Sequence, residues 1–447
     1  MGRRAHAQRL NIWLNGTPVG YWDAQAGRNS LTYFDEWLAD EQGRPLSLSL
    51  PFRPKNRPYL GPLVENYFDN QLPDSEAIRR RIAQHFKTDG IAPYQLLAAV
   101  GRDCVGAMQL LPADELPSDV FAINGEALSE SKVAALLRNT VSDRSFGQRE
   151  DETDLRLSIA GAQEKTALLW HKGRWHRPIG STPTTHILKL PPGLVGAMRA
   201  DMRTSVENEW LCSKIMAGFE LPTATCEIAR FEDIKVLVVE RFDRRLSVDA
   251  NWIVRLPQED FCQATGTSPL HKYQSDGGPG IGKIMEILLG SEAARSDRLH
   301  FFKTQIVFWL LAATDGHAKN FSICHLPGSR FRATPLYDVL SAHPILGTGA
   351  NHVAPQRARL AMAVRGTQNH YLIGEVQRRH WASHARQVGL GAEAAERIIA
   401  EVLARAPGVV AAVYQQIPEG FPADLADAIL NGLLSQCARL ERMEPGA

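Results

Sequence analysis

The stretch Ala313-Thr-Asp-Gly-His-Ala-Lys-Asn320 decides the expected fold, together with Leu336-Tyr337-Asp338 further along the chain. Transfer of a phosphoryl group from ATP needs a carboxylate beside the attacking hydroxyl and oxygen ligands for Mg²⁺. Asp315 and Asn320 are five positions apart, which is the spacing of the catalytic Asp and the metal-binding Asn in protein kinases. We therefore predict that Asp315 is the catalytic base, and that Asn320 and Asp338 bind the metal.

Residues upstream of this stretch supply candidates for phosphate binding. Lys189 lies in a predicted strand, 185–190, which Pro191-Pro192 ends. A loop with one glycine, 160–164, precedes it between two strand-like runs. Another apolar strand, 235–240, follows, and it ends in a charged segment. Lysine, strand and loop thus come in the order that an ATP site requires.

A helix is predicted between these strands, over 205–219. Ser205 is the expected N-cap, with acidic residues in the first turn and apolar residues at helical spacing. A helix-borne acid pairs with the strand lysine in protein kinases. From order alone we favour Glu209 over Glu207 for this partner of Lys189.

Each of these signals is weak alone. A strand lysine is more often an edge residue whose charged end reaches water. A single Asp-x4-Asn arises by chance in many proteins of this size, and Asp338 could equally cap a helix. Their serial order from Lys189 to Asp338 is harder to dismiss.

Alternation and helical spacing of apolar residues predict the remaining elements of the chain. Residues 10–25 predict a hairpin around Asn15-Gly16, and Ser47-Leu-Ser-Leu50 alternates like a strand. Helical spacing follows the alternating segments, and after about residue 256 strands become scarce. Predicted helices cover 75–86, 94–100, 281–289, 298–314, 392–404 and 423–442.

Composition excludes several classes of protein. The chain has 447 residues, 44% of them hydrophobic, so a large folded interior is expected and global disorder is not. The 50 basic and 49 acidic residues give a net charge of +1, so charge offers no general argument for binding nucleic acid or membrane. The six cysteines form no C-x-x-C pair, and no apolar run reaches the roughly 18 residues of a membrane span. We expect a cytoplasmic protein with reduced thiols and no membrane partner.

Longer motifs resemble one family. The chain is similar to HipA, the serine/threonine kinase toxin of type II toxin–antitoxin modules, from about Leu10 to near the C-terminus. Motifs of this length in this order are highly specific. The matching segments are Ser47-Leu-Ser-Leu-Pro51, Phe68-Asp-Asn-Gln-Leu-Pro73, Ser158-Ile-Ala-Gly-Ala-Gln-Glu-Lys-Thr166, Thr182-Pro-Thr-Thr-His-Ile-Leu-Lys189, Val239-Glu-Arg-Phe-Asp-Arg-Arg245, Leu256-Pro-Gln-Glu-Asp260, Ser275-Asp-Gly-Gly-Pro-Gly280, Ala313-Thr-Asp-Gly-His-Ala-Lys-Asn320 and Tyr337-Asp338.

The resemblance implies roles for particular residues. It makes Asp315 the catalytic base, Lys189 the phosphate-binding lysine, and Asn320 and Asp338 the Mg²⁺ ligands. It also assigns a phosphate loop at 160–165, an adenine-binding strand end at 240–242 and further nucleotide contacts. The implied ATP-binding residues are Ala160, Gly161, Ala162, Gln163, Glu164, Lys165, Lys189, Glu240, Arg241, Phe242, His317, Ala318, Lys319, Asn320, Tyr337 and Asp338.

The resemblance also implies regulation and partners. Ser158 matches a position that becomes autophosphorylated and silences the enzyme, and the added charge beside a phosphate loop would repel ATP. HipA-like toxins bind a dimeric helix-turn-helix antitoxin, HipB-like, on operator DNA, which would associate the protein with the nucleoid. In a basic segment, 377–386, Arg386 is the candidate DNA contact. The implied protein target is glutamyl-tRNA synthetase, and the implied outcome is growth arrest and persistence.

The expected fold class is α+β, a two-lobed atypical protein-kinase-like fold. The N-terminal half is mixed α/β with an extra β-rich module, and the C-terminal lobe is all-α. The expected divisions are 1–125 for the β-rich module, 126–255 for the nucleotide-binding lobe and 256–447 for the helical lobe. The kinase is atypical because no His-Arg-Asp precedes Asp315 and no Phe-Gly follows Asp338.

Three other interpretations are weighed against this one. The chain could be a small-molecule kinase, since antibiotic phosphotransferases share Asp-x4-Asn and a later metal-binding Asp. It could also be a non-catalytic corepressor that keeps only the fold. Finally, Gly277-Gly-Pro-Gly-Ile-Gly-Lys283 nearly spells a Walker A loop, but Ile284 replaces the Ser/Thr and no buried strand precedes it. We predict a connecting loop there.

Overall fold

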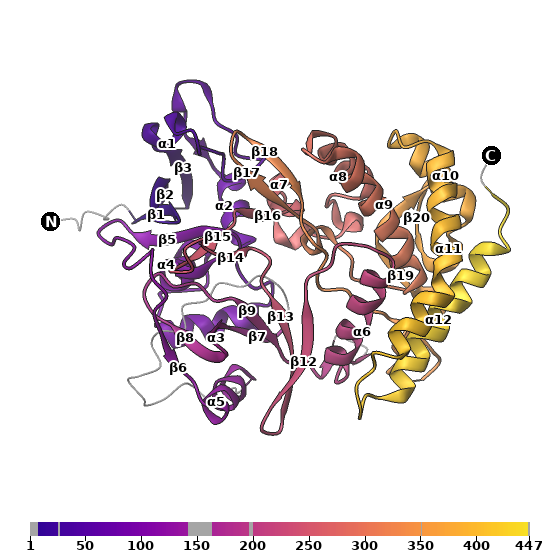
Figure 1. Cartoon of the computed structure of the whole chain (residues 1–447). Coiled ribbons are helices and arrows are strands. Elements are labelled where there is room, and N and C mark those ends of the chain that lie inside the picture. Colours follow the sequence, from indigo (N-terminus) through magenta and orange to yellow (C-terminus); the bar gives the residue numbers. More distant parts are fainter. Residues whose placement is uncertain (1–7, 26, 142–162, 196–199, 350, 446–447) are drawn as a thin grey trace.

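The structure is a computed structural model that describes residues 8–25, 27–141, 163–195, 200–349 and 351–445. Within these ranges, the buried apolar side chains form three hydrophobic clusters. Figure 1 shows the first part of the chain at one end of the molecule and the last helices at the other. The two-lobed α+β architecture expected from the sequence is confirmed.

The N-terminal part is a five-stranded sheet with strand order β4-β3-β2-β1-β5 and helices on it. The predicted hairpin is present as β1 and β2, joined at Asn15-Gly16. Trp22 of β2 stacks on Phe68, with ring centroids 4.0 Å apart, so this sheet has a core of its own. The elements are β1 (Gln8–Leu14), β2 (Thr17–Gln25), β3 (Arg28–Tyr33), α1 (Asp35–Ala39), β4 (Tyr59–Leu60), α2 (Pro62–Asp69), α3 (Glu76–Phe86), α4 (Pro93–Val100) and β5 (Met108–Pro112).

The strand predicted at Ser47-Leu-Ser-Leu50 is wrong: these residues form a turn. The hydroxyls of Ser47 and Ser49 donate to the carbonyl of Gln263, at 3.1 and 2.7 Å. The amide of Leu48 donates to Glu259 at 2.8 Å. The alternation therefore reflects contacts with a distant segment and not a sheet.

The middle part carries a six-stranded sheet of order β12-β13-β9-β7-β8-β6. Buried apolar residues of α5 pack on it, and α6 contacts β12 and β13 and lies between this sheet and the C-terminal helices (Figure 1). The elements are β6 (Gly125–Ala127), α5 (Glu130–Val141), β7 (Lys165–His171), β8 (Arg174–Pro178), β9 (His186–Lys189), β10 (Leu194–Val195), β11 (Ala200–Asp201), α6 (Ser205–Gly218), β12 (Cys226–Phe231), β13 (Ile234–Glu240), β14 (Arg244–Leu246) and β15 (Ile253–Arg255).

The C-terminal part is mainly helical, but describing it as all-α is wrong. It contains a three-stranded sheet, β16-β17-β18, and a pair, β19-β20. Their strands are three to seven residues long and lie where no element was predicted from the sequence. The elements are β16 (Gln258–Asp260), α7 (Phe261–Thr265), α8 (Ile281–Ile287), α9 (Ala294–Leu310), β17 (Ser322–Leu326), β18 (Arg330–Ala333), β19 (Arg359–Arg365), β20 (Asn369–Leu372), α10 (Arg378–Gln387), α11 (Ala392–Tyr414) and α12 (Ala423–Glu441).

A buried cluster of charges joins the N-terminal part to the six-stranded sheet. Asp103 lies 2.9 Å from Arg244, 3.3 Å from Arg255 and 3.4 Å from Arg241. Asp243 bonds Arg241 at 2.8 Å and accepts the amide N–H of Gly106 at 2.7 Å. Buried charges are stable only when paired, so these contacts fix how the two parts sit together. We call this set (Asp103, Arg241, Asp243, Arg244 and Arg255) the arginine cluster.

Candidate active site

The predicted site residues meet around one cavity of about 310 Å³. Glu164 and Ala318 do not line it, and Ser158, Ala160, Gly161 and Ala162 lie outside the described residues. Glu164 instead pairs with Arg81 of α3, and Ala318 is fully buried. The predicted residues that line the cavity are Gln163, Lys165, Lys189, Glu240, Arg241, Phe242, Asp315, His317, Lys319, Asn320, Tyr337 and Asp338.

Lys189 sits at the end of β9, next to two carboxylates. Its Nζ is 2.6 Å from Glu209 Oε1, and it also contacts Asp338 Oδ1. Its side chain is 5% exposed, so the pairing is shielded from water. The predicted choice of Glu209 is confirmed, because Glu207 instead pairs with Lys235.

The predicted N-cap of α6 is wrong. The helix begins at Ser205, and the residue in the N-cap position is Thr204, which makes no side-chain cap bond. The hydroxyl of Ser205 is buried, has no hydrogen-bond partner among the described residues, and lines the cavity. The sequence pattern located the helix correctly but shifted its first residue by one position.

A second lysine, Lys165, lies beside Lys189 in the sheet. The two residues are direct partners in the β7–β9 register. Burial lowers the pKa of Lys165 to about 7, and the positive charge of Lys189 adds to the effect. Two ammonium groups at one cavity wall form a surface that suits a polyphosphate.

Asp315 lines the same cavity and is exposed. Its side chain is 57% exposed, and the hydroxyl of Tyr273 donates to its Oδ1. His317 Nε2 is 3.9 Å from the same oxygen, and burial lowers the pKa of His317 to about 4, so this imidazole is neutral at pH 7. An accessible carboxylate that is fixed at one oxygen can accept a proton at the other.

Asn320 and Asp338 both line the cavity, and their side-chain oxygens are the candidate ligands for Mg²⁺. The side-chain oxygen of Asn320 accepts the amide N–H of His317 at 3.2 Å. Asp338 has a φ of 59°, an uncommon value for a residue other than glycine, and such backbone strain clusters at functional sites. Mg²⁺ needs only one or two carboxylates, with waters and phosphates as its other ligands, so these hard oxygen donors fit it. The described residues hold no group of three or more His, Cys, Asp or Glu that could bind a metal without a nucleotide.

Lys319 is surrounded by three polar residues for which no role was predicted from the sequence. Its Nζ donates to Asn70 Oδ1 and the Asn70 carbonyl, at 2.9 and 3.0 Å, and lies 3.6 Å from both Asp74 and Asp260. Asn70, Asp74 and Asp260 line the cavity, although no role was predicted for them. The motifs 68–73 and 256–260 were the available signal for Asn70 and Asp260, because they matched the family without an assigned chemistry. Asp74 lies one residue beyond the first motif.

The strand end at Glu240 needs a correction. Its free groups were expected to face adenine, yet the N–H of Glu240 donates to Thr225 and that of Arg241 to Thr185, both at 2.9 Å. The amide N–H of Phe242 finds no acceptor among the described residues and is the donor left for a ligand. The guanidinium of Arg241 belongs to the arginine cluster, and its carbonyl accepts the N–H of Arg244 at 3.1 Å, so neither end of this residue is left free for a nucleotide.

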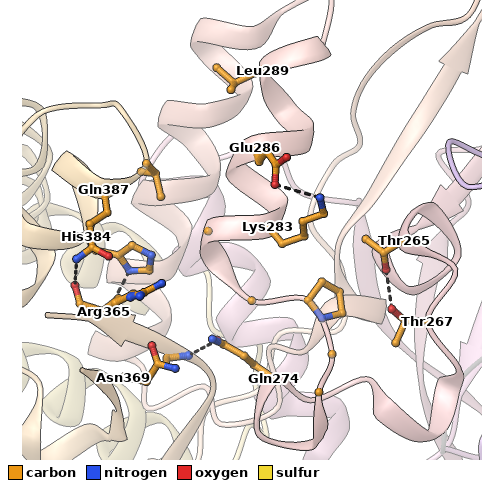
Figure 2. A pocket seen from close by; sticks show the side chains of 17 residues that line it. Thr265, Thr267, Gln274, Lys283, Glu286, Leu289, Arg365, Asn369, His384 and Gln387 are labelled. Atoms are coloured by element: carbon orange, nitrogen blue, oxygen red, sulfur yellow. Dashed lines mark hydrogen bonds and ion pairs between the residues drawn. The ribbon is translucent and has the colours of Figure 1, made fainter. Parts of the chain in front are cut away.

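The glycine stretch 277–283 lines a separate, open cleft of about 830 Å³ (Figure 2). Figure 2 shows Lys283 paired with Glu286, at 3.0 Å, rather than pointing back over the glycines as a Walker lysine would. No strand of the structure ends at this loop, which leads into the short helix α8. The prediction of a connecting loop is confirmed.

The basic segment around Arg386 is less basic than its sequence indicates. His380 and His384 are buried, and burial lowers the pKa of each to about 4, so both are neutral at pH 7. Arg378 pairs with Glu396 at 2.6 Å. Arg386 is exposed on α10 and remains a prediction.

Comparison with known proteins assigns the family. A model described as the HipA-like C-terminal domain matches residues 157–410, and one described as the HipA N-terminal domain matches residues 10–111. The chain belongs to the HipA family. The resemblance in sequence is thereby confirmed over both halves.

Three HipA-family or related proteins illustrate the likeness. "Putative kinase Y4mE" of Sinorhizobium fredii is 31% identical over 411 residues, 91% of this chain and 92% of the relative. The serine/threonine-protein kinase toxin HipA of Shewanella oneidensis is 26% identical over 331 residues, 72% of this chain and 71% of the relative. The structure of a Shewanella oneidensis HipA, HipB and operator DNA complex has a TM-score of 0.78 at 20% identity, covering 97% of this chain and 98% of that chain. That likeness shows the fold.

Within the described ranges, no helix has both the length and the apolar character needed to cross a membrane.

Proposed function

We propose that the chain is a serine/threonine protein kinase toxin that transfers the γ-phosphoryl group of ATP to a hydroxyl of a protein. The observation that carries the proposal is the convergence of Lys189, Asp315, Asn320 and Asp338 on one cavity, with Glu209 bonded to Lys189. Phosphoryl transfer is catalysed mainly by positioning and charge stabilisation, so such a convergence is what the chemistry needs. The kinase names of the relatives support the same reaction.

Each residue takes a role that its surroundings allow. Lys189, fixed by Glu209, binds the α- and β-phosphates, and Lys165 adds charge beside it. Asp315 accepts the proton of the attacking hydroxyl through its free oxygen. The backbone of Glu240 to Phe242, with the free N–H of Phe242, binds the adenine edge. Gln163, from the expected phosphate loop, and His317, Lys319, Asn320 and Tyr337 line the space proposed for the nucleotide.

Asn320 and Asp338 are the residues that would hold Mg²⁺. The ion would neutralise charge on the transferring phosphate. In the structure Asp338 contacts Lys189 through Oδ1, so Asp338 would hold the ion through Oδ2 or by giving up this contact.

The biological setting is proposed from the family. A HipB-like helix-turn-helix antitoxin dimer would neutralise the kinase on operator DNA, with Arg386 as a candidate phosphate contact. In the cytoplasm, or at the nucleoid when antitoxin is bound, phosphorylation of glutamyl-tRNA synthetase would halt growth. Phosphorylation of Ser158 would silence the enzyme by placing negative charge beside the ATP site.

The test is incubation of the purified protein with γ-labelled ATP and Mg²⁺, with and without glutamyl-tRNA synthetase. We expect label on the protein substrate and on Ser158, and none with the Asp315→Ala variant. Asp297→Ala is not a suitable control, because the carboxylate of Asp297 accepts hydrogen bonds from the hydroxyl of Ser291 and the amide of Ala333 in β18. Asp427→Ala, on the exposed face of α12, is the matched control and should retain full activity.

Two outcomes would overturn the proposal. Label on a small metabolite, with none on protein, would identify a small-molecule kinase. Growth arrest that persists with Asp315→Ala, without any transfer by the wild type, would identify a non-catalytic binding protein.

A further inference from the structure

Tyr273 is the side chain that directly fixes the proposed base. Its hydroxyl donates a hydrogen bond to Asp315 Oδ1, and its ring lies edge-on to His317 with centroids 5.1 Å apart. In the described part of the chain, Oδ2 of Asp315 has no hydrogen-bond partner. One carboxylate oxygen is therefore bound by the protein, and the other is open to an incoming hydroxyl.

The backbone around Tyr273 is tightly constrained. Its carbonyl accepts the N–H groups of Asp276 and Gly278, at 3.1 and 3.0 Å. A Cβ on Gly278 would lie 2.1 Å from the carbonyl oxygen of His271, so this turn admits only glycine at that point. The backbone of Tyr273 therefore cannot shift relative to Asp315 without breaking these contacts.

The residues on either side of Tyr273 anchor it to two different parts of the protein. The side chain of Gln274 lines the cleft of Figure 2 and accepts the amide N–H of Ala363, in β19, at 2.8 Å. The Nζ of Lys272 bonds Asp74, which follows α2 in the N-terminal part, at 2.7 Å. Tyr273 is thus held from the C-terminal lobe on one side and from the N-terminal part on the other.

Asp74 is suited to this anchoring. Burial alone would raise the pKa of Asp74, but the charges of Lys319 and Lys272 outweigh burial and keep the pKa below its usual value. Asp74 is therefore ionised at neutral pH, and Lys272 and Asp74 are 15% and 14% exposed. A shielded pair of this kind resists screening by salt better than a surface pair.

We propose that Tyr273 is a positioning residue for Asp315, and that Asp74 holds it in place through Lys272. The inference rests on the proposed function and extends it. A base in proton transfer is commonly oriented by a third group, and a hydrogen bond to an ionised oxygen is about twice as strong as a neutral one. Tyr273 fixes the rotation of the carboxylate, so that Oδ2 meets the acceptor hydroxyl. Phosphoryl transfer consequently depends on the N-terminal part, which contributes Asp74.

The test uses Tyr273→Phe, which removes only the hydroxyl. We expect kcat for protein phosphorylation to fall about 10-fold or more, from the loss of one hydrogen bond to a charged group. The dissociation constant for ATP and the melting temperature should stay at their wild-type values. If Tyr273 had only a structural role, the melting temperature would fall instead. Tyr371→Phe, on β20 and away from the cavity, is the matched control and should leave kcat unchanged.

Two variants test the link through Lys272. Asp74→Asn should lower kcat by a smaller factor, and Lys272→Gln should do the same by breaking the pair from its other side. Combined with Tyr273→Phe, either should lower kcat by less than the product of the separate factors, because both act on one carboxylate. Effects that multiply would overturn the link.

The remaining outcomes separate this inference from the proposed function. A Tyr273→Phe variant with wild-type kcat would overturn the positioning role, provided that wild type transfers phosphate and Asp315→Ala does not. A faster Tyr273→Phe variant would overturn it as well, because the hydroxyl would then block the acceptor. Absence of transfer by the wild type would instead refute the proposed function itself.

Discussion

Replacement of Asp103 by Asn tests whether the arginine cluster joins the two parts of the chain. Asp103 is 5% exposed and accepts hydrogen bonds from Arg244 at 2.9 Å and from the amide and hydroxyl of Thr184 at 3.0 and 2.7 Å. Burial would raise the pKa of Asp103, but Arg244, Arg241 and Arg255 together hold the pKa well below its usual range. The carboxylate is therefore charged throughout the neutral and mildly acidic range.

The expected loss follows from the charges that stay behind. In Asp103→Asn, Arg241 and Arg244 keep Asp243 as a negative partner, whereas Arg255 keeps none among the described residues. The new amide N–H₂ group is itself a donor and faces the donors of the arginines. Removing one partner of a buried ion pair costs about 3–5 kcal/mol. With a urea slope of about 3 kcal/mol/M, the upper end for small proteins, the unfolding midpoint should fall by about 1 M or more.

The assay is urea denaturation followed by tryptophan fluorescence, with Asp427→Asn on the exposed face of α12 as the control. A depressed carboxyl pKa stabilises the fold above the unfolded-state value, about 3.9, and the contribution is lost as pH falls through the folded-state pKa. The difference between wild type and Asp103→Asn should therefore be constant from pH 5 to 8 and shrink in stronger acid. A midpoint within about 0.2 M of wild type would refute the reasoning.

Two further predictions concern the nucleotide site. Glu209→Gln should lower kcat/KM for ATP about 10- to 100-fold, because it removes a charged hydrogen bond from Lys189. Glu207→Gln, whose partner is Lys235, should have little effect. Steady-state kinetics would measure both values, and equal losses would contradict the assignment. Since the pKa of Lys165 is lowered to about 7, bound polyphosphate should raise it, so ATP binding at pH 7.5 should take up protons. Calorimetry in two buffers of different ionisation enthalpy would measure this uptake, and an unchanged uptake in Lys165→Met would exclude Lys165 as its source.

Local sequence patterns correctly predicted the elements that carry several of the site residues. The hairpin at Asn15-Gly16, the strand of Lys189 and the helix of Glu209 were all correct, because turn residues and periodicity report on neighbours along the chain. Glu209 was preferred over Glu207 by order, and the contact with Lys189 agrees.

Contacts between distant segments explain the failures. Ser47 to Leu50 alternates like a strand because its hydroxyls meet Gln263, more than two hundred residues away. Asn70 and Asp74 reach Lys319 only after the N-terminal part has packed on the catalytic segment. The amides of Glu240 and Arg241 are hydrogen-bonded to Thr225 and Thr185, from segments beside β13. The sequence of β13 alone does not show which segments lie beside it.

The arginine cluster also bears on how the polypeptide can be divided. A truncated protein that starts after residue 125 would expose Arg241, Arg244 and Arg255 without Asp103, and Lys319 without Asn70. Such a truncation should be poorly soluble when expressed alone. Co-expression with the missing first segment should restore it by fragment complementation, since the complementary charges would reassemble in trans.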